Sequence, residues 1–102
     1  MREIEPCVYL MASDRLGTLY VGVTSNLVGR VMQHRDGTFD GFTKKHGINR
    51  LVWFETGSSM EGAIAREKAI KKWRRDWKCN LIERANPEWN DLAVELGLDP
   101  LT

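Results

Sequence analysis

The fold is decided by two short runs, PCVYLMA at residues 6–12 and TLYVGVT at residues 18–24. Both are apolar or rich in β-branched and aromatic residues, which is typical of strands. The segment Asp14-Arg15-Leu16-Gly17 supplies turn residues between them, so the two runs predict an antiparallel hairpin. Gly22 lies two residues after Tyr20, where a missing side chain lets another group approach the sheet closely.

The next part of the chain predicts a helix, a loop and a third strand. Ser25 or Asn26 can cap a helix that runs to about Arg35 and ends at Asp36-Gly37. Residues 37–47 contain three glycines and predict a loop with at most one helical turn. Residues 48–56 (INRLVWFET) predict the third strand.

The remaining residues predict helices only. Ser58 and Glu61 form a capping box before a helix over residues 60–81, which we expect to break near Asp76. Asn86-Pro87 predicts the start of a last short helix that ends before Gly97. Three short strands cannot form a two-sheet sandwich, so we expect an α/β (α+β) fold, a small three-stranded antiparallel sheet flanked by helices.

Length and composition predict one small domain over residues 1–102. No apolar run approaches the roughly 20 residues of a membrane span, and residues 1–5 lack the apolar stretch of a signal peptide. Cys7 and Cys79 are too far apart for a CxxC zinc pattern and too few for a disulfide framework. We therefore expect free thiols and a reducing, cytoplasmic location without a membrane.

The net charge of +1 hides an uneven distribution of charge. Residues 86–102 carry −4, so residues 1–85 carry +5. Between positions 66 and 78, seven basic residues face only Glu67 and Asp76. Such a dense basic helix face can neutralise phosphates, although an ordinary solvated helix face would have the same composition.

Glu67 falls where an apolar side chain is expected. It lies four residues after Ala63 and three before Ile70, on the apolar face of the predicted helix. Removing a carboxylate from water is costly unless a partner compensates. The helix could be rotated so that Glu67 pairs with an arginine at the rim, or Glu67 could be a metal ligand or catalytic group.

Four further residues could carry chemistry. Tyr9 and Tyr20 lie one in each strand of the hairpin, where half-buried packing is the ordinary role of a tyrosine. Arg30 and His34 are four residues apart and share a helix face. They could hold a phosphate and assist proton transfer, but two solvated residues would have the same spacing.

In order and spacing, these residues resemble the GIY-YIG nuclease superfamily, in particular its small bacterial single-domain members, often called excinuclease-subunit-like. Cys7-Val8-Tyr9, ten residues, and Tyr20-Val21-Gly22 are similar to the paired tyrosine motif, with Cys7, Val8 and Val21 as departures. Arg30 and His34 match the family's helix arginine and histidine, and Glu67 matches its metal-binding glutamate. Asn80, with Asn86 as a competitor, matches a downstream asparagine. The resemblance covers residues 5–85 and leaves an acidic helix at 86–102.

The resemblance implies an endonuclease that hydrolyses phosphodiester bonds in DNA with one Mg²⁺ or Mn²⁺ ion. Glu67 would hold the ion and would point at the sheet face, where the ion and the hydroxyls of Tyr9 and Tyr20 would meet its carboxylate. Tyr20 would act as the general base. Tyr9 would orient Tyr20 or the attacking water, Arg30 would clamp the phosphate, and His34 would orient groups or relay a proton. Contacts to the substrate are expected from Arg30, Lys44, Lys45, Lys71, Arg74 and Asn80.

Two other functions fit the same residues. The first is a nucleic-acid-binding module that does not cleave, which shares the basic face. The second is a protein-interaction domain that uses the acidic C-terminal segment with Trp89 and Leu92, although this segment could equally pack on the body of the domain. Whether the substrate is single-stranded, duplex or branched DNA, or RNA, is left open by the sequence, as are the pathway (DNA repair is one candidate) and the oligomeric state.

Overall fold

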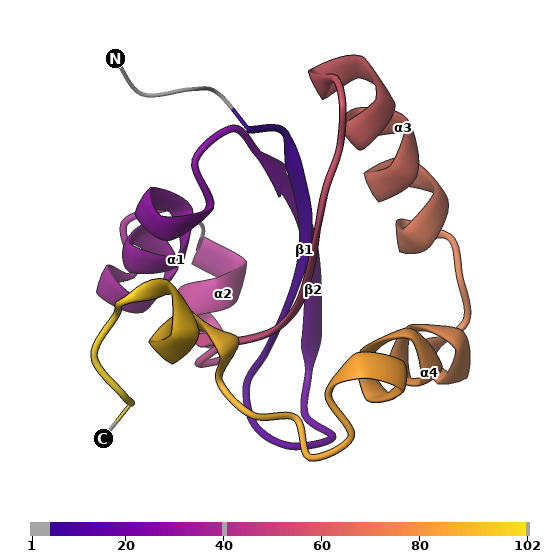
Figure 1. The fold of residues 1–102 in the computed structure, drawn as a ribbon. Helices are drawn as coiled ribbons and strands as arrows, with labels where there is room; N and C mark the ends of the chain where they lie inside the picture. Colours follow the sequence, from indigo (N-terminus) through magenta and orange to yellow (C-terminus); the bar gives the residue numbers. More distant parts are fainter. Residues whose placement is uncertain (1–4, 40, 102) are drawn as a thin grey trace.

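A three-stranded antiparallel sheet forms the centre of the computed structural model, which describes residues 5–39 and 41–101 (Figure 1). The strands are β1 (Cys7–Ala12), β2 (Leu19–Thr24) and β3 (Arg50–Thr56), in the order β2-β1-β3. The predicted hairpin of β1 and β2 is confirmed, and β1 is buried along its whole length between two edge strands. The predicted fold class is confirmed as well.

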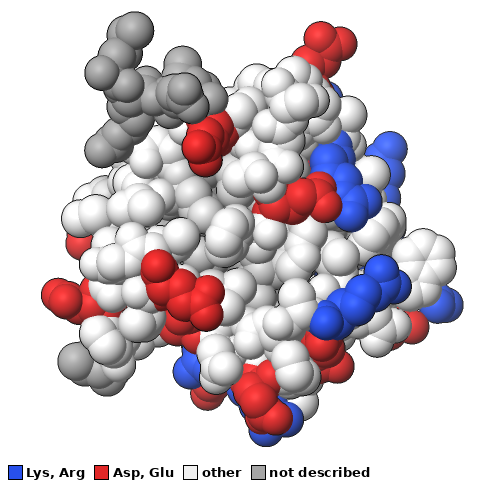
Figure 2. Space-filling view, viewed as in Figure 1, with Lys and Arg blue, Asp and Glu red and all other residues white. Residues whose placement is uncertain are grey.

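Helices cover both faces of the sheet (Figure 1). One face carries α1 (Leu27–Asp36), α2 (Gly41–Lys45) and the 3₁₀ helix η1 (Leu92–Leu96), and the other carries α3 (Met60–Lys71) and α4 (Arg75–Ala85). None of the helices in the described ranges is long and apolar enough to cross a membrane. Lysine and arginine side chains gather on the α3 and α4 side in the view of Figure 2, and the charged side chains on the opposite side of that view are mostly acidic.

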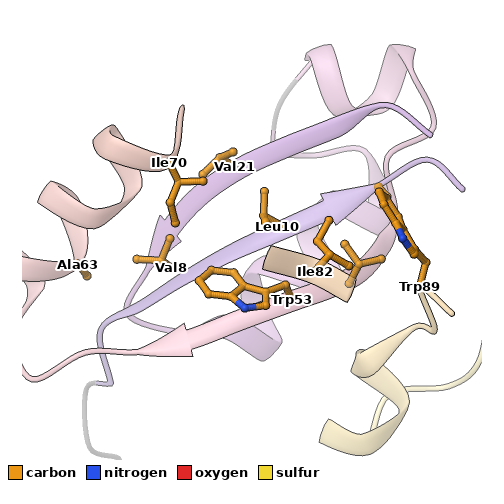
Figure 3. Close-up of a cluster of buried hydrophobic side chains, with 10 residues drawn as sticks. Val8, Leu10, Val21, Trp53, Ala63, Ile70, Ile82 and Trp89 are labelled. Carbon is orange, nitrogen blue, oxygen red and sulfur yellow. The ribbon is translucent and has the colours of Figure 1, made fainter. Parts of the chain in front are cut away.

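The alternation of side chains along the strands divides the core into two layers. Val8 and Leu10 point to the face covered by α3 and α4, where Ala63, Ile70 and Ile82 meet them (Figure 3). The residues that alternate with these two in β1 point to the other face and pack against α1 and η1. This second layer contains Tyr9, Met11, Val31, Ile48, Leu51 and Ala93.

The ends of α1 and the start of α3 agree with the sequence, but the cap of α3 does not. The Asn26 side chain caps α1 by accepting from the Gly29 N–H at 3.1 Å, and Gly37 ends the helix in the left-handed region. The capping box predicted on Ser58 and Glu61 is wrong, because Ser59 is the N-cap and accepts from the Gly62 N–H at 3.0 Å. The helix begins at Met60 as expected, so the residue directly before it, and not Ser58, is the N-cap.

The predicted long helix is broken earlier than expected. Residues 72–74 separate α3 from α4, so the break precedes Asp76, which lies in the first turn of α4. The backbone N–H groups of Lys72 and Trp73 bond to the carbonyl oxygens of Ala69 and Ile70, and this closes α3 in a tighter turn. The break lets α4 pack on β3 while α3 packs on β1 and β2.

The C-terminal segment is a short 3₁₀ helix rather than a helix that begins at Asn86-Pro87. Asn86 is the C-cap of α4, and the N-cap of η1 is Asp91, whose carboxylate accepts from the Ala93 N–H at 3.1 Å. Trp89 is fully buried, and its Nε1–H donates to Glu83 at 2.7 Å. The acidic segment therefore packs on the body of the domain, and Trp89 is not available to a protein partner.

Candidate active site

Two tyrosines and a histidine form a cluster on the α1 face of the sheet. Tyr9 in β1 is paired with Gly22 in β2, and Tyr20 in β2 is paired with Met11, so both tyrosine rings point to the same face. The Tyr9 hydroxyl lies 2.8 Å from Nε2 of His34 on α1. The Tyr20 ring lies edge-on to the imidazole, with 5.1 Å between the centroids, and 6.3 Å from the Tyr9 ring.

Gly22 makes room for the Tyr9 ring. A Cβ atom at this position would lie 2.4 Å from both Cζ and Oη of Tyr9, far inside van der Waals contact. The expected close approach to the sheet at Gly22 is thus made by Tyr9 itself. The glycine lets the tyrosine lie flat across β2 and bring its hydroxyl to His34.

His34 is held from two sides. Its Nδ1 lies 3.1 Å from the hydroxyl of Thr43 in α2, and Nε2 faces Tyr9. A neutral imidazole has one nitrogen that donates and one that accepts. A hydroxyl can do either, so the Tyr9 and Thr43 hydroxyls can pair with the ring in both of its tautomers. Only 3% of His34 is exposed, so both the position and the ring plane of this histidine are set by the fold.

Arg30 joins the cluster through Phe39. The guanidinium carbon lies 3.9 Å from the centroid of the Phe39 ring, which also lies edge-on to His34. The same guanidinium donates from Nη1 to the carbonyl oxygen of Val23 at 3.4 Å and from Nε to Gln33 at 3.2 Å. Arg30 is therefore anchored beside the edge strand β2, with Tyr20 in the same strand.

Burial divides the cluster into inner and outer groups. Tyr9 is fully buried and His34 nearly so, whereas Tyr20 and Arg30 are partly exposed. A substrate outside the protein could touch only the outer pair. The inner pair can act only through the groups that it supports.

Glu67 is buried as the periodicity of its helix predicts, with 7% of the residue exposed. Its partner is the ammonium group of Lys71, one turn along α3, at 2.6 Å, rather than an arginine at the rim. The expected meeting of the Glu67 carboxylate with the two tyrosine hydroxyls is not what the structure shows. The apolar face of α3 packs on the Val8, Leu10 and Val21 side of the sheet, opposite to Tyr9 and Tyr20.

The carboxylate of Glu67 suits a hard divalent cation. It is drawn out of water, and the structure already places a positive charge against it. Across residues 5–39 and 41–101 there is no group of three or more histidine, cysteine or acidic residues that could hold an ion. Mg²⁺ is commonly bound through one or two carboxylates, with water and phosphate oxygens as the other ligands, so a single glutamate is a sufficient protein ligand.

The expected phosphate contacts lie on both sides of the sheet. Lys44 and Lys45 are exposed on α2, on the tyrosine side. Arg74, in the turn before α4, and Asn80, on α4, are exposed on the other side. Lys71 lies there too, but its ammonium group is engaged by Glu67.

Asn86, the competitor of Asn80, has a structural role. Its side chain is buried, and Nδ2 donates to the carbonyl oxygens of Val52 at 3.0 Å and of Asn90 at 2.9 Å. Its Oδ1 accepts from the Asn90 N–H at 3.0 Å. These bonds attach the end of α4 to β3, so Asn86 is committed to the fold, and Asn80 is the asparagine with an exposed amide.

The sequence did not reveal that Thr43 would bond to His34, or that Phe39 would pack between Arg30 and His34. Both lie in or beside the glycine-containing segment that was expected to be a loop, where no periodicity identifies a buried or packed side chain. The Lys71 partner of Glu67 could have been found, because a Glu followed by Lys four residues later is a common helix pair.

Comparison with known proteins identifies the family. The GIY-YIG catalytic domain model matches residues 5–80. The chain is 39% identical over 83 residues to a UPF0213 protein of Syntrophus aciditrophicus, covering 79% of this chain and 92% of that protein. It is 33% identical over 81 residues to a UPF0213 protein of Clostridium perfringens, covering 79% and 87% of the two chains.

A solved structure shows the same fold. The solution NMR structure of a UPF0213 protein from Bacillus halodurans superposes with a TM-score of 0.54 at 23% sequence identity, covering 96% of this chain and all of that chain. At this identity the likeness concerns the fold alone. The domain match over most of the chain and the 39% identical relative show that the protein is a small member of the GIY-YIG nuclease superfamily.

Proposed function

We propose that this protein is a divalent-metal-dependent endonuclease that hydrolyses phosphodiester bonds in DNA. The observation that carries the proposal is the pair of Tyr20 and Arg30 at the edge strand β2, supported from beneath by the buried hydrogen bond between Tyr9 and His34. In these roles a proton acceptor, Tyr20, and a phosphate-binding cation, Arg30, would share one partly exposed surface.

Tyr20 is the proposed general base. Its Oη would take a proton from the attacking water. A tyrosine has an ordinary pKa near 10, so the phenolate needs nearby positive charge to act at neutral pH. Arg30 supplies such a charge, and its planar guanidinium can also donate to two oxygens of one phosphate.

Tyr9 and His34 are proposed as positioning residues. Their burial keeps them from the substrate, and their hydrogen bond fixes the surface on which the Tyr20 ring lies. Thr43 completes this support by holding Nδ1 of His34. A rigid base is more effective than a mobile one because its orientation entropy is already lost.

Glu67 would hold a Mg²⁺ or Mn²⁺ ion, which would supply positive charge for the phosphate and the leaving oxygen. Helix α3 packs on one face of β2, and α1, which follows β2 in the chain, covers the other face. A phosphate at this edge of the sheet could therefore be approached from both faces. Lys71 is half exposed, so its ammonium can leave Glu67 and turn to a phosphate. Lys44, Lys45, Arg74 and Asn80 are the other proposed contacts to the backbone of the substrate.

The test is cleavage of labelled single-stranded, duplex and branched DNA, and of RNA, with Mg²⁺ or Mn²⁺. We expect metal-dependent cutting that disappears in Glu67→Ala and Tyr20→Phe. Glu61→Ala is the matched control, because Glu61 is an exposed carboxylate in the first turn of the same helix. Equal activity in wild type and both site variants would overturn the assignment.

A binding module without cleavage is the second candidate function. The observation in its favour is that Lys71 already neutralises the Glu67 carboxylate. Binding of the same substrates without cutting in the presence of either ion would select it.

Both cysteines are free thiols, which agrees with the proposed location in a reducing cytoplasm.

A further inference from the structure

Two tryptophans pack against each other where α3 passes into α4. The rings of Trp73 and Trp77 are 6.1 Å apart and nearly perpendicular. Trp73 is partly buried and rests on the core, whereas Trp77 is 49% exposed. A tryptophan ring is the largest apolar group in proteins, and one that is half exposed beside a second ring marks a surface that can bind.

Arginines lie over both rings. The guanidinium carbon of Arg74 is 5.1 Å from the Trp77 centroid, and that of Arg66 is 5.4 Å from the Trp73 centroid. Arg74 also pairs with Asp76, and Arg66 with Glu55, but these pairs are exposed and so contribute little. Seven basic residues against two acidic ones between positions 66 and 78 leave the surroundings strongly positive.

A ligand for this surface needs a flat apolar face and negative charges at a short distance from it. A nucleotide has both, because its base stacks on an aromatic ring while its phosphate meets arginine. A base in a duplex is already stacked on its neighbours and cannot lie on Trp77. An acidic peptide would satisfy the arginines but not the exposed ring.

We infer that Trp73, Trp77, Arg66 and Arg74, here called the tryptophan surface, bind an unpaired nucleotide, with the base on Trp77 and the phosphates on the arginines. The inference rests on the proposed function and narrows its substrate to nucleic acid with a single-stranded segment, such as a flap, a branch or a free end. The surface lies on the α3 and α4 side, so the strand would run past Glu67.

The test measures binding without cleavage, in the presence of a chelator. Fluorescence anisotropy follows a short labelled thymidine strand, the matching uridine strand and a blunt duplex of equal length. We expect Trp77→Ala to weaken binding of the single strands by about tenfold and to leave the duplex unchanged. Trp77→Phe should keep most of the affinity, and Arg74→Ala should weaken binding and lower the salt dependence by about one phosphate contact.

Val94→Ala is the matched control, since Val94 is an apolar side chain of 44% exposure on η1, on the other side of the sheet. Unchanged binding of single strands by Trp77→Ala, or equal loss for strand and duplex, would overturn the inference while leaving the proposed function intact. A further outcome is that a polyglutamate peptide displaces the strand and loses as much affinity as the strand does in Trp77→Ala. That result would assign the surface to an acidic protein and would overturn the inference as well. A wild type that binds no nucleic acid in the chelator would overturn the inference, and one that also neither binds nor cuts with Mg²⁺ or Mn²⁺ would overturn both proposals.

Discussion

The hydroxyl of Tyr9 lies 2.8 Å from Nε2 of His34, and neither residue reaches the surface. The two come from β1 and α1, 25 residues apart in the chain. Their bond ties the helix that carries Arg30 to the central strand of the sheet. Its loss should therefore disturb both the stability of the fold and the geometry of the candidate site.

Tyr9→Phe removes this bond without changing the shape of the ring. We expect a loss of about 1 to 3 kcal/mol in the free energy of unfolding, because a buried imidazole nitrogen loses its partner. Thr43→Val removes the bond at the other ring nitrogen and should cost a similar amount. Urea denaturation of both single variants and the double variant checks this. Additive losses would show that the two bonds are independent rather than parts of one network.

Gly22→Ala should be more damaging than its size suggests. The added methyl group would lie 2.4 Å from the Tyr9 ring, in a strand where the ring cannot move away without breaking its bond to His34. Overpacking of this kind costs about 3 kcal/mol. Gly41→Ala is the control, because a Cβ there meets nothing within 4 Å. Equal thermal midpoints for the two variants would contradict the close approach.

The hairpin and the buried position of Glu67 could be predicted because each depends on local periodicity. Alternation in strands places Tyr9 and Tyr20 on one face, and helical spacing places Glu67 between Ala63 and Ile70. Periodicity does not say which face of the sheet a helix covers. The sequence alone therefore placed Glu67 beside the tyrosines, whereas α3 packs on the opposite side.

Other features were out of reach because tertiary contacts override local signals. Asn86 before Pro87 has the pattern of a helix start, but its amide is used to join α4 to β3. The five residues of α2 are too few to show a period, so Thr43 could not be recognised as the partner of His34. The Asn86 contact joins segments 34 residues apart in the chain, which no local pattern can reveal.

The two asparagines should separate stability from activity. Asn86→Ala removes one buried and two partly buried hydrogen bonds, and we expect it to lose about 3 kcal/mol of stability. Asn80→Ala changes an exposed side chain and should leave the unfolding midpoint unchanged while it weakens substrate binding. Denaturation and nucleic-acid binding, measured on both variants, check this. A stable Asn86→Ala variant with impaired binding would reverse the assignment.

Cys7 should make the fold less stable in alkaline solution. Burial, with smaller contributions from the charges of Glu5 and Glu55 and opposed by a backbone hydrogen bond with Glu55, raises the pKa of the Cys7 thiol from 9.0 to about 11. Between these values the unfolded chain has lost the thiol proton and the folded chain keeps it. Stability is therefore complete below pH 9 and falls as the pH rises toward 11, by about 2 kcal/mol.

Urea denaturation of wild type and of Cys7→Ala is measured across this pH range. The difference between their free energies of unfolding reports the Cys7 thiol alone, because tyrosines and lysines titrate in both proteins and cancel. Cys79→Ala, at the other free and only partly buried cysteine, is the control for the substitution itself. A Cys7→Ala variant whose stability declines as steeply as that of wild type would show that the thiol is not responsible.

Lys71 and a divalent ion should compete for the Glu67 carboxylate, which lies 2.6 Å from the lysine ammonium. Lys71→Met leaves a buried carboxylate without a cation, so in the absence of metal we expect the variant to lose about 1 kcal/mol of stability. Added Mn²⁺ should then raise its thermal midpoint more than it raises that of wild type, because the ion no longer has to displace an ammonium group. Glu67→Gln should show no such rise.

Lys68→Met is the matched control, since Lys68 is exposed on the same helix, directly after Glu67 in the chain, and the carboxylate pairs with Lys71 instead. Its response to Mn²⁺ should equal that of wild type. Identical midpoint shifts in wild type, Lys71→Met and Glu67→Gln would mean that the ion binds elsewhere. A smaller shift in Lys71→Met than in wild type would mean that the lysine assists the ion, for example by holding the carboxylate in position, and the competition would be ruled out.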